Sequence, residues 1–158
     1  MSKWLSVVEN SLLILSASIM SIIAFGNVLS RYFLDNSLAF TEEITINLFV
    51  LLTFVGAAVG VKNHSHLGFT LLFDKSNLKV KKILALVTGL IVIAVFIIFA
   101  FYGMKMVQYQ MQIGQTTPSL GWKQWMFTLG FPLGSILCII RAAESTVKEL
   151  KNLQSESE

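Results

Sequence analysis

The chain has 158 residues, of which 54% are hydrophobic and 13% are charged, roughly half the charged share of a soluble domain. Four stretches without a charged side chain, 21, 18, 22 and 17 residues long, lie at 10–30, 44–61, 83–104 and 124–140. Each is close to the roughly 20 residues that cross a hydrocarbon core, which excludes a soluble globular domain, a disordered chain and a disulfide-stapled secreted module. An outer-membrane barrel would instead alternate apolar and polar residues. The composition predicts a single all-α integral membrane domain, 1–158, with four transmembrane helices.

The first span is predicted at 10–31. Its apolar stretch runs for about 20 residues, beyond the 7–15 of a signal peptide, so we expect an uncleaved span. Five serines and Asn27 lie along it. Small and hydroxyl residues let helix backbones approach one another in a bilayer, so this helix should pack against protein along that face.

The second span is predicted at 42–61, with Glu42 and Glu43 in its first turn. Carboxylates there favour the positive end of the helix dipole. Towards the other end, Gly56 and Gly60 form a small-xxx-small pair. Such a pair permits close contact between transmembrane helices, so we expect this face to meet another helix.

The connection at 62–82 holds the longest basic stretch of the chain and, within it, an apolar segment at 67–73. This pattern predicts a short interfacial helix that lies flat between spans two and three, with its apolar side chains in the acyl boundary.

The third span is predicted at 83–104, where Ile, Val, Phe and Ala dominate as in a lipid-facing helix. The fourth is predicted at 122–141 and begins with Trp122 and Trp125, an aromatic pair that suits a membrane interface. Pro132 within this span predicts a kink.

The distribution of basic residues predicts the orientation in the membrane. If both termini and the connection at 62–82 share one side, that side carries nine Lys and Arg residues and the other carries three. Basic residues collect in cytoplasmic loops, so we expect cytoplasmic N- and C-termini and a charged cytoplasmic tail, 142–158, that starts helical and then frays. The same rule accounts for the net charge of +3 without a nucleic-acid partner.

Ionisable residues occur at the ends of the predicted spans and not in their middle. A transporter that acts alone would place a charged or polar break near the midplane, so we expect no transport pathway in this chain itself. Arg31 should pair with Glu42 or Glu43 and tie the first two spans together at the outer interface. Docking of a partner protein on Arg31 is the alternative.

The sequence lacks the constellations of an enzyme or a cofactor site. There is no glycine-rich phosphate loop, and the only cysteine, Cys138, lies inside the fourth apolar stretch. His64 and His66 are two residues apart in one connection, whereas a bis-histidine haem needs imidazoles on facing helices. We therefore predict no catalytic residue, no cofactor and no metal ligand in this chain.

One block of sequence carries a specific pattern. Residues 27–33 read NVLSRYF, residues 37–43 read SLAFTEE, residues 56–58 read GAA, and His66 follows the second span. This pattern resembles the small membrane subunit of the tripartite ATP-independent periplasmic (TRAP) transporters, the DctQ/SiaQ type, whose motif runs N-V-x-x-R-Y and then S-x-x-W-x-E-E. Phe40 stands where that family usually has Trp, and the residues after His66 also differ.

The resemblance covers about residues 10–141 and implies a function in a transporter of the bacterial inner membrane. Such a subunit forms a heterodimer with a large membrane subunit, which binds substrate and sodium and moves as an elevator. A periplasmic substrate-binding protein delivers an organic acid, sialic acid or a C4-dicarboxylate, and the small subunit serves as scaffold. Ten residues are candidates for packing and partner contact: Asn27, Arg31, Tyr32, Glu42, Glu43, Gly56, Gly60, His66, Trp122 and Trp125.

Two other functions fit a small four-span protein. One is the membrane anchor of a respiratory enzyme, which would hold haem or quinone. The other is a small exporter that acts alone as a homodimer.

Overall fold

The computed structural model describes residues 3–35, 38–62 and 77–155. Apart from a bridge between Thr116 and Lys123, the described residues form helices and the turns that connect them. The helices are α1 (Lys3–Leu34), α2 (Ala39–Lys62), α4 (Leu78–Gln112), α5 (Gln124–Thr128) and α6 (Gly130–Ser155).

Four helical stretches are long and apolar enough to cross a membrane, which confirms the predicted all-α fold with four spans. They are Leu5–Phe33, Ala39–Val61, Leu78–Gln112 and Gln124–Ser155. The first and third exceed their predicted spans at both ends, the second begins three residues earlier than predicted, and the fourth begins at 124 instead of 122 and continues past 141. Charged residues mark the edge of the apolar core, but a helix can continue through the interface. The predicted interfacial helix falls mainly on residues 63–76, which lie outside the described part, and the cytoplasmic location of the termini stays a prediction.

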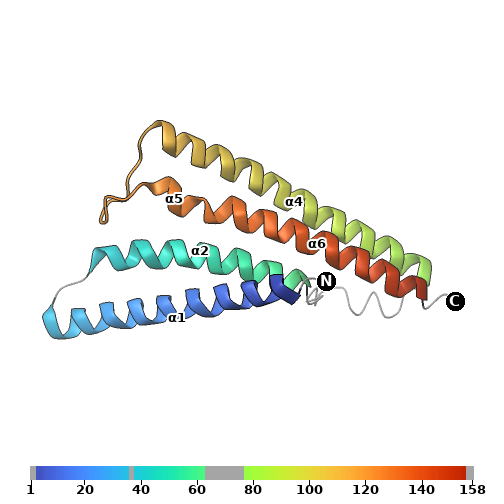
Figure 1. Ribbon diagram of the computed structural model, residues 1–158, viewed down its shortest axis with the longest axis horizontal. Coiled ribbons are helices and arrows are strands. Elements are labelled where there is room, and N and C mark those ends of the chain that lie inside the picture. The colour runs from blue at the N-terminus through green and yellow to red at the C-terminus, as the bar shows by residue number, and fades with distance from the viewer. Residues whose placement is uncertain (1–2, 36–37, 63–76, 156–158) are drawn as a thin grey trace.

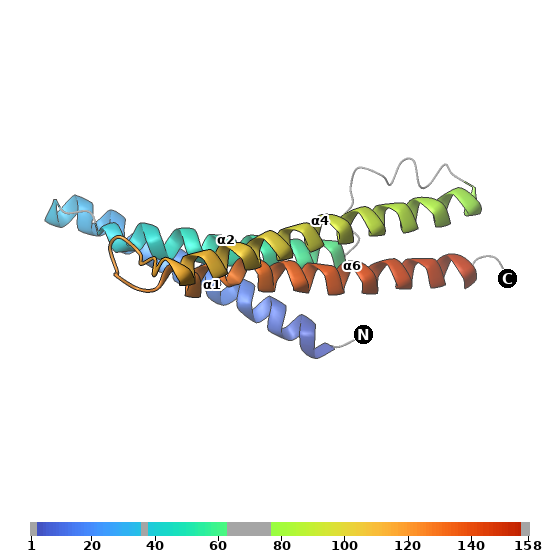
Figure 2. The ribbon, with the colours of Figure 1, turned by 90° about the horizontal axis from the view of Figure 1, so that it is seen from above.

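The long helices lie side by side in the order α1, α2, α6, α4 (Figure 1). α1 packs on α2, α2 on α6, and α6 on α4. The view turned by 90° shows the helices overlying one another, with the N-terminal end of α1 leaning away (Figure 2). The chain therefore forms an open layer and not a closed four-helix bundle.

The open layer leaves many apolar side chains uncovered by the chain itself. Ile22 and Phe25 on α1 are 71% and 64% exposed, and Ile91 on α4 is 59% exposed. Such side chains are favourable in a bilayer, where lipid or another membrane protein covers them.

Two of the close helix contacts are made at glycines that face aromatic residues. A Cβ added to Gly103 of α4 would lie 2.4 Å from a ring carbon of Phe131 on α6. A Cβ on Gly134 of α6 would lie 2.5 Å from the Cβ of Phe54 on α2. The rings of Phe54 and Phe131 meet edge to face with centroids 4.7 Å apart. The core of the layer is therefore the junction of α2, α4 and α6, because only glycine leaves room for these rings.

The fourth span is broken where its proline requires it. α5 ends at Thr128 and α6 begins at Gly130. Pro132 has no N–H for the carbonyl of Thr128, four residues earlier, and its ring would clash with that carbonyl in a continuous helix. The predicted kink is thus a helix break just before the proline.

The segment predicted as a fraying tail is helical as far as Ser155. α6 continues because its C-terminal half packs against the N-terminal half of α4. A Cβ on Gly89 of α4 would lie 2.2 Å from the hydroxyl oxygen of Thr146, and Leu153 is buried. The charged residues of this half occupy the remaining faces of the same helix.

Candidate functional site

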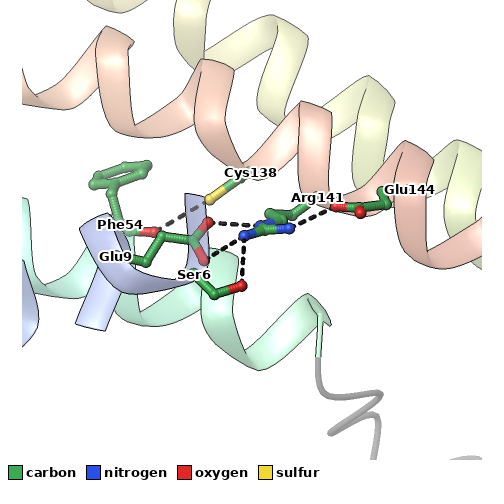
Figure 3. A network of polar contacts seen from close by, with 6 residues as sticks. All are labelled: Ser6, Glu9, Phe54, Cys138, Arg141 and Glu144. Carbon is green, nitrogen blue, oxygen red and sulfur yellow. Dashed lines mark hydrogen bonds and ion pairs between the residues drawn. The ribbon is translucent and has the colours of Figure 1, made fainter. Parts of the chain in front are cut away.

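The most deeply buried charges form one cluster, which we call the Glu9 cluster: Ser6, Glu9, Arg141 and Glu144 (Figure 3). The Nε of Arg141 donates to one carboxylate oxygen of Glu9 at 2.6 Å, and its Nη2 donates to the other at 2.7 Å. The side chains of Glu9 and Arg141 are each 1% exposed. The planar guanidinium matches both carboxylate oxygens, which gives the pair its defined geometry.

The other two members occupy two of the three remaining N–H donors of the guanidinium. Arg141 also donates from Nη1 to Glu144 and from Nη2 to the hydroxyl of Ser6, at 3.3 Å. Glu144 lies one helical turn beyond Arg141 and is half-buried. Because α1 packs mainly on α2, this cluster is what attaches α1 directly to α6. It makes the N-terminal part of α1 a fixed part of the layer.

Sequence reasoning placed Glu9 and Arg141 at span ends but assigned neither a role. A signal was present, because Glu9 precedes the first apolar stretch and Arg141 follows the fourth. In a four-span chain these two positions lie at the same membrane edge, and their charges are opposite.

A second polar contact lies at the other end of the layer and holds the connection between α4 and α5. The carboxylate of Glu43, in the second turn of α2, accepts the backbone N–H of Ser119 at 2.6 Å and that of Leu120 at 3.2 Å. We call residues 113–123 together the outer turn, after its predicted side of the membrane. Two consecutive amides thus bind one side chain from a helix that is remote in sequence.

The outer turn also has internal hydrogen bonds. The N–H of Thr117 donates to the carbonyl of Trp122 at 2.7 Å, and the N–H of Trp122 donates to the Thr117 hydroxyl at 3.1 Å. At its base, the N–H of Gln124 donates to the carbonyl of Gln115. Gly121 has a φ of 66°, the left-handed conformation that glycine adopts without strain. The turn is therefore a defined structure and not a loose connection.

The predicted ion pair of Arg31 with Glu42 or Glu43 is wrong. Within residues 3–35, 38–62 and 77–155, Arg141 pairs with Glu9 and with Glu144, whereas no ion pair joins Arg31 to Glu42 or Glu43. Glu43 binds the outer turn instead, because two backbone amides lie within its reach. Arg31 is exposed near the end of α1.

The surroundings of Arg31 are open. Tyr32 is 81% exposed, and Val28, Arg31, Tyr32 and Asp35 line a hollow. Asp35 ends α1 with a φ of 48°, the left-handed conformation common after helices. Among the described residues, none forms an ion pair with Arg31 or Asp35, so this corner of the layer has charged groups open to a partner.

Asn27 has a contact within the chain. Its side-chain carbonyl accepts the N–H of Leu38 at 3.0 Å, which joins α1 to the residue before α2. This bond gives the side-chain carbonyl of Asn27 a structural role near the end of the first span.

The glycine pair of the second span does not make the close contact that we expected within this chain. A Cβ on Gly60 would meet nothing within 4 Å, and one on Gly56 would meet only Leu13, at 3.9 Å. The close contacts belong to Gly89 and Gly103 of α4, which the sequence pattern did not single out, and to Gly134 of α6, which forms a small-xxx-small pair with Gly130 in the predicted fourth span. Whether Gly56 and Gly60 contact a partner stays a prediction.

The remaining candidate residues lie near the outer turn or outside the described part. The ring of Trp122 stacks on that of Phe127, with centroids 6.0 Å apart, and Trp125 is half-buried. His66 is outside the described residues. Across the described residues, no group of three His, Cys, Asp or Glu side chains could hold a metal ion. The Glu9 cluster and the contact of Glu43 with the outer turn are thus of a kind that holds helices and turns in place.

Residues 20–152 match the family model described as "Tripartite ATP-independent periplasmic transporters, DctQ component". The chain is 25% identical over 146 residues to the ectoine TRAP transporter small permease protein TeaB of Halomonas elongata, which covers 92% of the chain and 76% of that relative. It is 30% identical over 125 residues to the C4-dicarboxylate TRAP transporter small permease protein DctQ of Pseudomonas aeruginosa, which covers 77% of the chain and 60% of that relative. A protein of the same name from Vibrio cholerae is 31% identical over 80 residues, which are 51% of the chain and 34% of that relative.

Proposed function

The chain belongs to the DctQ family, the small permease components of TRAP transporters, and from this we propose that it is the scaffold subunit of a sodium-coupled importer of an organic acid. It is a multi-pass protein of the bacterial inner membrane, and its family consists of transporter subunits and not of enzymes. Its partners would be a large membrane subunit and a periplasmic substrate-binding protein. The large subunit would bind substrate and sodium, and this chain would bind no cofactor.

The observation that carries the proposal is the open layer of helices. Each long helix packs mainly on its one or two neighbours in the layer, and many apolar side chains on the broad faces are not covered by the described residues. The most buried charged side chains, Glu9 and Arg141, form an ion pair with each other and so are not available to bind a substrate. A layer that is fixed by such a pair is suited to present a stable face to a moving partner.

The substrate would be a small organic acid. Two relatives are named for ectoine transport and for C4-dicarboxylate transport. The resemblance to the DctQ/SiaQ type adds sialic acid as a candidate. We propose a C4-dicarboxylate or sialic acid as the substrate. Ectoine is a test substrate whose transport would contradict that choice.

The test is co-purification followed by transport. The chain is tagged at its C-terminus, expressed in the bacterium that encodes it, and extracted in mild detergent. We expect a stoichiometric large membrane subunit. Liposomes with both subunits should then take up labelled succinate or N-acetylneuraminic acid when the binding protein and an inward sodium gradient are supplied. Omission of the small subunit should abolish uptake.

Two outcomes would contradict the proposal. A haem absorbance band and a co-purifying soluble redox enzyme would favour the respiratory anchor, which the family membership does not support. Uptake by liposomes that contain this chain alone would show that it has its own transport pathway.

A further inference from the structure

We propose that Glu43 is a positioning residue of the transporter: its carboxylate holds the outer turn in the conformation that the periplasmic binding protein meets. The inference rests on the proposed function, because it assumes that this end of the layer faces the periplasm. It adds a residue and a mechanism to that function.

The contact of Glu43 gives the outer turn bonds beyond those that close it. The turn joins α4 to α5 across 11 residues, 113–123, and its own hydrogen bonds already close it. Glu43 adds two charge-assisted bonds from another helix, to Ser119 and Leu120. Bonds of this type are roughly twice as strong as neutral ones. Their effect is to fix where the turn lies relative to α2.

The bonds to Glu43 also decide which groups the turn presents. With the amides of Thr117, Ser119, Leu120 and Trp122 all occupied, the backbone at the tip offers few free donors. Side chains are presented instead, and Trp122 is 58% exposed. Exposed aromatic residues on a rigid backbone are typical anchors of protein interfaces.

The position of the turn favours a soluble partner on the periplasmic side. The Lys residues at the start of α4 and the end of α6 lie at the opposite end of the layer, where the positive-inside rule predicts the cytoplasm (Figure 1). Asn27 joins α1 to the start of α2 at the same end as the outer turn. Glu43 therefore attaches the α4–α5 connection to the α1–α2 pair, and the end of the layer becomes one preorganised surface. Preorganisation strengthens binding because less order must be imposed when the partner docks.

The experiment measures the binding of the purified binding protein to the purified two-subunit membrane complex. Glu43→Gln keeps the size of the side chain but replaces one acceptor with a donor that faces an amide. Thr117→Val keeps the Glu43 carboxylate and its bonds to Ser119 and Leu120, but it removes the hydroxyl that accepts from Trp122 and also bonds Glu43, so it loosens the turn from the turn's own side of the contact. Glu149→Gln, a carboxylate-to-amide change at the other end of α6, is the matched control. Hydrogen exchange reports the protection of the amides in the turn.

We expect Glu43→Gln to raise the Kd of the binding protein roughly ten-fold, the effect of about one lost charge-assisted bond. The large subunit should still co-purify, and the amides of Ser119 and Leu120 should exchange faster. Thr117→Val should also raise the Kd of the binding protein, and Glu149→Gln should leave it unchanged.

An unchanged Kd in a complex whose turn amides exchange faster would overturn the inference, since the turn would then be mobile without consequence. If Glu43→Gln prevents assembly, the Kd of the Thr117→Val complex decides instead: a raised Kd supports the inference and an unchanged Kd overturns it. Failure of the wild-type chain to co-purify with a large subunit would instead refute the proposed function. The two failures are therefore distinguishable.

Discussion

Replacement of Arg141 by Met tests the Glu9 cluster most directly. The change removes both bonds to Glu9, at 2.6 and 2.7 Å, together with the bonds to Ser6 and Glu144. It leaves the carboxylate of Glu9, 1% exposed, without its cation. Removal of one partner from a buried pair costs about 3–5 kcal/mol, because the remaining charge is unpaired in a medium of low polarity. With the scaling of domains of similar size, this corresponds to a Tm lower by roughly 6–20 °C.

The chain provides its own probe for this measurement. Cys138 is the only cysteine and is fully buried, with its thiol donating to the carbonyl of Phe54. A dye that fluoresces on reaction with thiols should therefore report unfolding in detergent as temperature rises. The matched control is Arg31→Met, which removes an exposed arginine outside any described ion pair and should cost less than about 1 kcal/mol.

A double variant separates the charge pair from simple packing. Glu9→Leu combined with Arg141→Met replaces the pair by apolar side chains, which is often neutral or stabilising. We expect the double variant to recover most of the stability that Arg141→Met loses. If Arg141→Met and Arg31→Met have equal Tm values, or if the double variant is no more stable than Arg141→Met, the reasoning about an unpaired buried charge is refuted.

Three further predictions concern helix contacts and orientation. Gly134→Leu should lower the free energy of unfolding of the isolated chain by roughly 1–3 kcal/mol, because its Cβ would lie 2.5 Å from that of Phe54. Gly60→Leu, the control, should leave the unfolding midpoint unchanged, because a Cβ there meets nothing within 4 Å. Asn27→Ala should lower the free energy of unfolding by about 1 kcal/mol through loss of the bond to Leu38, and an effect near zero would show that water replaces it. A cleavable tag at the C-terminus should be cut by added protease only in inside-out vesicles, and cleavage in intact spheroplasts would reverse the predicted orientation.

The Gly60 comparison also bears on partner contact. Gly60 has open space around it in this chain, so Leu at this position is costly only if another helix occupies that space. A variant that is stable alone but co-purifies poorly with the large subunit would assign this face of α2 to the interface. A variant that is normal in both measurements would assign it to lipid.

The sequence by itself determined the number of spans and their helical nature. Backbone groups in a bilayer core find no water, so an apolar run of about 20 residues has to satisfy them within a helix. The charges at the ends of the runs then define the spans, and the NVLSRYF and SLAFTEE blocks indicate the family. The break near Pro132 was also predictable, since proline lacks the donor that a continuous helix needs.

Only the tertiary structure decided which faces meet. Lipid is as apolar as a protein interior, so the contact face of a membrane helix is not marked by hydrophobic periodicity. Gly60 and Gly134 both belong to small-xxx-small pairs, yet Gly60 has open space while Gly134 sits against Phe54. The partners of Glu9 and Glu43 lie more than 70 residues away, and their bonds exist because the layer α1, α2, α6, α4 brings remote segments together.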